Sequence, residues 1–144
     1  MINIFFEDVE ILGLDPEFFI SWLSDTCSNE GKELEEVNLI FCSDEYLLQK
    51  NIEFLQHDYY TDIITFDYCQ DDIIMGDLFI SKDRVLDNAN QNNVSFENEL
   101  HRVIVHGVLH LCGYKDKSES QEKLMREKED FYLNRIVPRG TSQI

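Results

Sequence analysis

Two histidines lie four residues apart in the stretch HGVLHLCGYKD, which spans residues 106–116 of the 144-residue chain. A helix there would place His106 and His110 one turn apart on a single face. The surrounding segment 96–112 is mostly apolar, which predicts a largely enclosed helix. Two buried imidazoles without partners are costly, whereas a divalent metal can take one nitrogen from each at this spacing. The pair therefore predicts a metal site on a buried helix.

A third ligand is expected from the residues that follow this helix. Gly113 should end it, because glycine accepts the left-handed conformation that a helix C-terminus often requires. The chain can then turn back and bring Asp116 to the same metal. Two imidazole nitrogens and one carboxylate oxygen are an accepted catalytic zinc set, with a fourth position left for water. The alternative is that Asp116 caps the last helix or lies in a surface turn.

The ligand spacing H-x-x-x-H-x-x-G-x-x-D matches the extended zinc-protease motif, in which a histidine occupies the last position. Those proteases place a glutamate directly after the first histidine as general base. Here that residue is Gly107, which disfavours a protease of this kind. Cys112 points off the ligand row and is a poor fourth ligand, which favours an open, catalytic site.

The elements that must position this site are short strands and amphipathic helices. Periodicity predicts strands over residues 2–6, 37–43, 62–68 and 73–81, the last two as a hairpin. Helices are expected from Pro16, after Ser43, from residue 81, over 96–112 after Ser95, and over 118–135. The last helix should turn four side chains inward, namely Leu124, Met125, Phe131 and Leu133. This order predicts an α+β fold with a small mixed sheet of about four strands packed against about five helices.

Length and composition are those of one globular domain, with 43% hydrophobic residues. We expect a single metallohydrolase domain over residues 1–137 and a flexible polar tail over 138–144. No stretch is apolar enough for a membrane span and the N-terminus does not resemble a signal peptide, so a cytoplasmic location is expected. The four cysteines form no CxxC pair and are expected to be free thiols.

The net charge of −17 argues at first against a nucleic-acid partner. The charge is uneven, however, because residues 101–144 hold eight of the 12 Lys and Arg residues but only six of the 29 Asp and Glu residues. The basic residues therefore gather on the segment that carries the histidines. They form either a contact surface for RNA, which Lys123 and Arg126 would serve, or simply the solvated faces of two helices.

The stretch HGVLHLCGYKD resembles the H-G-x-L-H-L-x-G-Y-D-H signature of the YbeY family of metal-dependent endoribonucleases. TDIITFDY (61–68) resembles the family strand P-T-D-V-L-S-F-P, and MGDLFIS (75–81) resembles L-G-D-I-x-I-S. FENELHRVIVHG resembles the lead into the metal helix, so the resemblance covers most of residues 44–133. It implies an enzyme of ribosomal RNA maturation and ribosome quality control, with ribosomal RNA and the ribosome as partners. One divalent metal, Zn²⁺ by expectation, would activate water for attack on a single-stranded RNA phosphodiester.

The chain departs from the family pattern at the site itself. The third family histidine falls on Asp116 and the aspartate before it on Lys115, so the expected ligands are His106, His110 and Asp116. A carboxylate in place of an imidazole lowers the net charge at the metal, so we expect a less acidic bound water and an altered metal preference. An arginine of the family pattern falls on Leu55.

No side chain is marked by the sequence as a general acid or base. Arg102, one turn before His106, is a candidate for contact with a phosphate, or else it pairs with Glu99 or another acid. Lys115 is a second candidate for stabilising charge on the phosphate. Glu99 and Glu119 either orient the ligand imidazoles or occupy ordinary surface positions.

Two other functions fit the same residues. One is a metallopeptidase-like hydrolase that uses another carboxylate as its base. The other is a ribosome-binding or protein-binding module with a non-catalytic metal, which predicts a closed site of four ligands.

Overall fold

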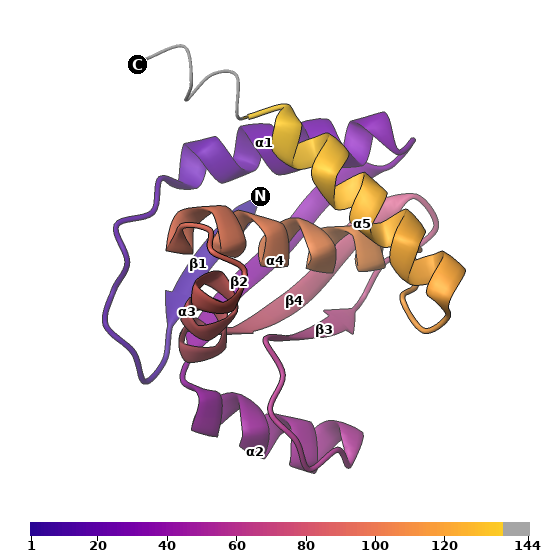
Figure 1. The fold of residues 1–144 in the computed structure, drawn as a ribbon. Coiled ribbons are helices and arrows are strands. Elements are labelled where there is room, and N and C mark those ends of the chain that lie inside the picture. Colours follow the sequence, from indigo (N-terminus) through magenta and orange to yellow (C-terminus); the bar gives the residue numbers. More distant parts are fainter. Residues whose placement is uncertain (137–144) are drawn as a thin grey trace.

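The computed structural model describes residues 1–136 (Figure 1). Over this part of the chain it has four strands and five helices, which confirms the predicted α+β class. In chain order they are β1 (Ile2–Phe6), α1 (Pro16–Asn29), β2 (Glu33–Cys42), α2 (Asp44–Leu55), β3 (Ile63–Asp67), β4 (Ile73–Ser81), α3 (Lys82–Gln91), α4 (Phe96–Leu111) and α5 (Glu119–Asn134). The proposed boundary between a domain and a tail after residue 137 lies outside the described residues.

The four strands form one mixed sheet in the order β1-β2-β4-β3. β1, β2 and β4 run parallel, and β3 pairs antiparallel with β4, for example Ile64 with Phe79. The predicted hairpin and the mixed sheet are thus confirmed. β3 forms one edge of the sheet, so it pairs with β4 on one side and with no strand on the other.

β2 begins earlier than its sequence indicates. The acidic stretch from Glu33 to Glu36 has low strand propensity, and the prediction started the strand at Val37. In the structure β2 is a central strand, and Glu33 pairs with Ile73 of β4. Pairing on the β4 side therefore extends the strand through residues that would not form one alone.

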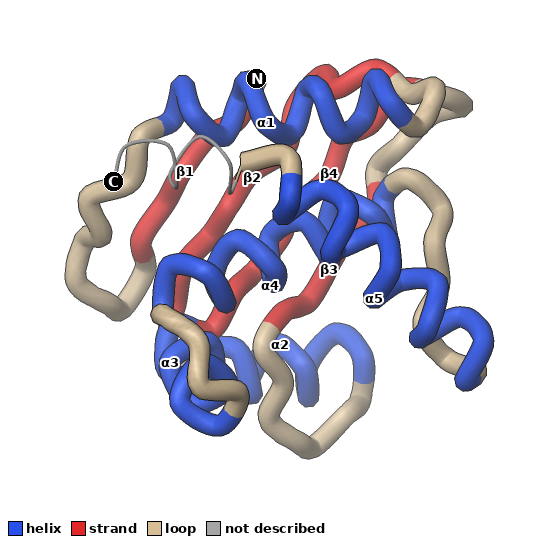
Figure 2. The backbone as a smooth tube through the Cα atoms, turned by 45° about the horizontal axis from the view of Figure 1, so that its top comes forward, coloured by secondary structure: helices blue, strands red, loops and turns tan. Residues whose placement is uncertain are grey.

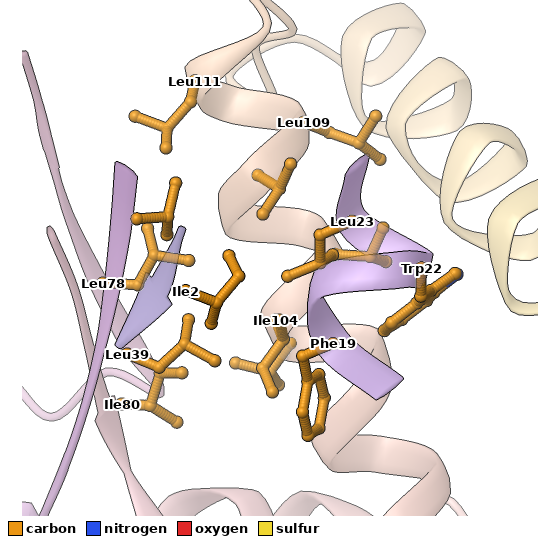
Figure 3. Packing of buried hydrophobic residues seen from close by; sticks show 14 of the residues in the cluster. Ile2, Phe19, Trp22, Leu23, Leu39, Leu78, Ile80, Ile104, Leu109 and Leu111 are labelled. Carbon is orange, nitrogen blue, oxygen red and sulfur yellow. The ribbon is translucent and has the colours of Figure 1, made fainter. Parts of the chain in front are cut away.

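One face of the sheet carries the main core, and helices α1 and α4 pack against it (Figures 1 and 3). Leu39, Leu78 and Ile80 from the strands meet Leu23 of α1 and Ile104 of α4. Gly107 lets α4 approach closely, because a Cβ there would lie 2.7 Å from Ile63 Cδ1 and 2.9 Å from Leu78 Cδ1. The helix that carries the histidines is therefore held directly on β3 and β4.

α5 packs across α4 on the side away from the sheet (Figure 2). Met125 and Leu133 are buried as predicted, but the prediction was wrong for Leu124 and Phe131, which are 44% and 46% exposed. Tyr132 is fully buried instead, and its backbone carbonyl accepts a 3.0 Å hydrogen bond from Trp22 Nε1 of α1. The buried face of α5 is set by these contacts with α1 and α4 and not by hydrophobicity alone.

The predicted caps at Ser43 and Ser95 are confirmed, and the structure adds a cap at the start of α5. Ser43 and Ser95 each accept a hydrogen bond from a backbone N–H three residues on, and Ser118 forms a capping box with Gln121. All four cysteines are free thiols. Among the described residues, no helix combines the length and apolar character needed to cross a membrane.

Candidate metal centre

The three predicted ligands come together at the C-terminal end of α4. His106 Nε2 lies 3.1 Å from His110 Nε2, and each of these nitrogens lies 3.2 Å from Asp116 Oδ2. Gly113 ends the helix with φ of +109°, and this turn returns the chain to the histidine face. Ser118, not Asp116, caps α5, so the alternative role of Asp116 as that cap is excluded.

The triangle of ligand atoms has the size that a small divalent ion requires. Ligands about 2.0–2.1 Å from a tetrahedral zinc stand roughly 3.3 Å from one another. The observed separations of 3.1–3.2 Å match this value closely. The side chains are partly open, with Asp116 37% exposed, so the donor set fits a metal that can still be reached from outside.

The imidazoles are oriented by hydrogen bonds on their other nitrogens. His106 Nδ1 lies 2.6 Å from Glu129 Oε2, and His110 Nδ1 lies 2.9 Å from the carbonyl oxygen of Tyr114. Because both acceptors are oxygens, each Nδ1 carries the proton and donates it. The lone pairs of both Nε2 atoms are thereby left free and face Asp116, which is the arrangement found around histidine-bound metals.

Glu129 connects α5 to the ligand helix. Its side chain is only 6% exposed and accepts hydrogen bonds from His106 and from Arg102, at 2.8 Å. Burial tends to raise the pKa of Glu129, but the bonds from His106 and Arg102 outweigh burial and hold the pKa below its ordinary value. Glu129 is thus an anionic support for the first ligand.

The residues that orient the imidazoles differ from those predicted. Glu99 is buried but makes no hydrogen bond to either ligand imidazole, so it does not orient them, and Glu119 is exposed at the start of α5, as the surface alternative anticipated. Arg102 forms ion pairs with Glu129 and Asp130, as the ion-pair alternative anticipated. Glu129 lies 23 residues beyond His106, and no local spacing marks it in the sequence.

A cleft of about 610 Å³ opens beside the three ligand atoms. One wall is the end of α4 with residues 113–117, which include Lys115 and Lys117. The other wall is formed by Leu55 and the residues from Thr61 through β3. The predicted phosphate candidate Lys115 therefore lies in the cleft, and so does Leu55.

Asp62 also lines the cleft but is not one of the three clustered ligands. It is half-buried, and its carboxylate accepts a 3.3 Å hydrogen bond from Asn88 Nδ2. Burial raises the pKa of Asp62, and nearby His106 only partly opposes this effect. Carboxyl groups with raised pKa values in clefts are suited to proton transfer. Asp62 is not among the site residues predicted from the sequence.

Ion pairs occupy many of the basic residues in the second half of the chain. Of the seven Lys and Arg residues between 101 and 136, four lie within 4 Å of a carboxylate oxygen, namely Arg102, Arg126, Lys128 and Arg135. Their acidic partners are Glu129, Asp130, Glu30 and Asp25. The basic bias of this segment is therefore largely balanced within the fold.

Fold and site together define a small α+β protein in which a His/His/Asp cluster that could hold a metal ion lies at the end of a helix buried against a mixed sheet. Residues 14–137 match the family described as Endoribonuclease YbeY. An Endoribonuclease YbeY from Porphyromonas gingivalis is 50% identical over 132 residues, which cover 92% of this chain and 87% of that protein. One from Flavobacterium johnsoniae is 56% identical over 112 residues, which cover 78% and 81%.

A solved structure has a similar fold. The solution structure of a Thermotoga maritima protein superposes with a TM-score of 0.68 at 28% identity, and the match covers 99% of this chain and 93% of the other. The chain belongs to the YbeY endoribonuclease family.

Proposed function

We propose that this protein is a metal-dependent endoribonuclease that cleaves single-stranded RNA in ribosomal RNA maturation and ribosome quality control. The observation that carries the proposal is the triangle of two Nε2 atoms and one carboxylate oxygen at 3.1–3.2 Å, placed on a cleft in a chain of this family. The relatives named above are endoribonucleases by description. Ribosomal RNA and the ribosome are the proposed partners.

His106, His110 and Asp116 would hold one divalent ion, with Zn²⁺ favoured by the nitrogen and carboxylate donors. Such an ion, when bound, supplies Lewis-acid activation of water and neutralises charge on a phosphodiester. Glu129 keeps His106 in the correct tautomer, and the Tyr114 carbonyl does the same for His110. Lys115 lines the cleft beside Asp116 and would attract the phosphate group.

The metallopeptidase alternative is disfavoured by the packing around Gly107. The zinc-protease base would stand at this position, but even a Cβ there would lie under 3 Å from the side chains of Ile63 and Leu78. Either these two side chains or the backbone of α4 would have to shift to admit a glutamate there. Cleavage of casein by the purified protein would favour a peptidase over a nuclease.

The decisive experiment measures metal content by mass spectrometry and cleavage of single-stranded ribosomal RNA on the same preparations. We expect wild type to carry the ion, and His110→Ala and Asp116→Ala to lose it together with cleavage, by on the order of a hundredfold or more. His101→Phe is the matched control on the same helix, because it keeps a ring against Phe18 and Trp22. Metal without cleavage in wild type would support the binding-module alternative, and absence of metal would refute the site.

A further inference from the structure

A pair of stacked rings lies on the segment that borders the cleft opposite the ligands. Leu55 and Thr61 both line the cleft, and residues 56–60 connect them. Within this segment the rings of His57 and Tyr59 stack, with centroids 5.1 Å apart and planes 18° apart. Tyr59 Oη lies 2.9 Å from His57 Nδ1. We call His57 and Tyr59 the ring pair.

The backbone beneath the ring pair is anchored. Asn51 of α2 is 1% exposed and donates a 2.9 Å hydrogen bond from Nδ2 to the carbonyl oxygen of Tyr59. The backbone N–H of His57 in turn donates to the carbonyl oxygen of Asn51 at 3.1 Å. The ring pair therefore projects from a fixed turn, so a ligand that contacts it would not have to order a free loop.

Within residues 1–136, no further ring and no cation packs against the ring pair, whereas the neighbouring rings of Tyr60 and Phe54 each pack against one. Tyr60 donates a hydrogen bond to Glu45 and lies under the guanidinium of Arg84. Phe54 packs edge-on against Phe66. Both members of the ring pair are exposed, Tyr59 by 56%, and within residues 1–136 no further ring stacks on either of them.

We propose that the ring pair stacks an unpaired base of a single-stranded RNA whose phosphate backbone enters the cleft. This inference rests on the proposed function and adds how the substrate is held. Aromatic rings bind bases without sequence preference, because every base has a π-face. Asp58 lies between His57 and Tyr59 in the sequence, and its carboxylate would repel a phosphate, so this surface suits a base and not a phosphate.

The charge of the chain favours the same mode of binding. The chain has a net charge of −17, and four of the seven described basic residues in its second half are ion-paired. Lys115 and Lys117 line the cleft and leave room for a few phosphate contacts. An RNA strand is therefore held chiefly through its bases, and its affinity should depend only weakly on salt.

The test measures binding of a fluorescent adenine octamer with 2′-O-methyl ribose by anisotropy, with the strand checked for integrity afterwards on a gel. The comparison probe is an octamer of the same backbone without bases. We expect Tyr59→Leu to raise Kd for the adenine octamer roughly tenfold. The matched control is Phe5→Leu, which removes a 48% exposed ring from β1, at the edge of the sheet opposite β3. It should bind within about twofold of wild type.

Three further readouts decide the inference. Wild type should prefer the adenine octamer over the abasic one. The slope of log Kd against log salt should stay below about two for wild type. Tyr59→Leu should leave that slope unchanged. Equal binding of both octamers, no binding by wild type, or unchanged affinity in Tyr59→Leu would each overturn the ring pair as a base site. Circular dichroism checks that Tyr59→Leu is folded, as expected because Asn51 holds the backbone of Tyr59 and not its ring.

RNA cleavage by wild type is assayed separately so that the two proposals can fail independently. Cleavage combined with normal binding by Tyr59→Leu would overturn the ring pair and leave the nuclease in place. Base-dependent binding without cleavage would support the ring pair and overturn the proposed nuclease activity.

Discussion

The two walls of the cleft are built in opposite ways. On the α4 wall, both histidines and Tyr114 are held by hydrogen bonds to other groups of the fold. Glu129 orients His106, the Tyr114 carbonyl orients His110, and Glu30 accepts a 2.6 Å hydrogen bond from the Tyr114 hydroxyl. The opposite wall presents Leu55, which is 43% exposed, and leads into the exposed ring pair.

The difference matches the two tasks that the proposed function gives to the walls, metal binding and contact with RNA. A metal tolerates errors of only a few tenths of an ångström in its ligands, so the ligands are placed on a helix and supported from behind. Stacking on a base tolerates sliding and rotation, so an anchored turn is sufficient. In the proposed function, the chemistry therefore takes place on the rigid wall, and the wall opposite contacts the RNA strand.

The largest effect should come from weakening the rigid wall at Glu129. Glu129→Gln keeps an acceptor for His106 Nδ1 but removes the negative charge that strengthens that bond. We expect Zn²⁺ affinity to fall about 10- to 100-fold, as measured by competition with a chromophoric chelator. RNA cleavage should fall at limiting zinc and recover in part when zinc is added.

Asp130→Asn provides the control for Glu129→Gln. Asp130 is the other carboxylate that binds Arg102, at 2.7 Å, and it makes no hydrogen bond to His106. Its replacement should leave zinc affinity within about threefold of wild type. An equal loss in both variants would mean that the position of Arg102, and not the support of His106, limits metal binding.

A smaller effect, and a dependence on pH, should come from Glu30. It accepts hydrogen bonds from Tyr114 and Tyr132, and Lys128 lies 3.5 Å away. Burial tends to raise the pKa of Glu30, but the two tyrosines and Lys128 outweigh burial and hold the pKa below its ordinary value of 4.5. A carboxyl whose folded pKa is lowered stabilises the protein above the unfolded pKa, and this stability is lost as pH falls through the folded pKa.

Glu30→Gln should therefore reduce the free energy of unfolding by about 1–2 kcal/mol at pH 7. The difference from wild type should shrink as the pH falls below about 4.5. Urea unfolding at both ends of this range measures it. Glu10→Gln, at an exposed carboxylate, corrects for the relief of repulsion in a chain of net charge −17. A difference that stays constant with pH would mean that the ionised carboxylate is not what stabilises this contact.

Local patterns were enough to predict the parts of the fold that depend on neighbouring residues. Ser43 and Ser95 cap helices where their sequences indicate, and the spacing of His106 and His110 with Gly113 predicted the ligand geometry. In each case the interacting groups lie within about ten residues of one another along the chain.

Contacts between distant segments could not be predicted in the same way. Glu129 contacts His106 from another helix. Asp62 lines the cleft because it directly precedes β3, which pairing with β4 places there. The buried face of α5 was assigned wrongly for Leu124 because hydrophobicity could not reveal that Tyr132 packs beside α1. These positions depend on which helices meet, and that is fixed only in the assembled fold.

The smallest predicted effect comes from Leu55→Arg, which tests the wall opposite α4. Leu55 lines the cleft and is 43% exposed, so an arginine can enter without loss of a buried core residue. Its guanidinium would add about one phosphate contact to a strand otherwise held through its bases. We expect Kd for the adenine octamer to fall a few-fold at low salt and the slope of log Kd against log salt to steepen by about one.

Leu55→Met separates the added charge from the change of shape at this wall. It should leave both Kd and the salt slope close to wild type, because methionine replaces leucine with little change in volume. The Leu55→Arg variant should also still lose affinity when Tyr59→Leu is added, since stacking and phosphate contact act on different parts of the strand. If the slope did not change in Leu55→Arg, the strand would not place its phosphates along this wall. The cleft would then be entered from the side of Lys117 instead.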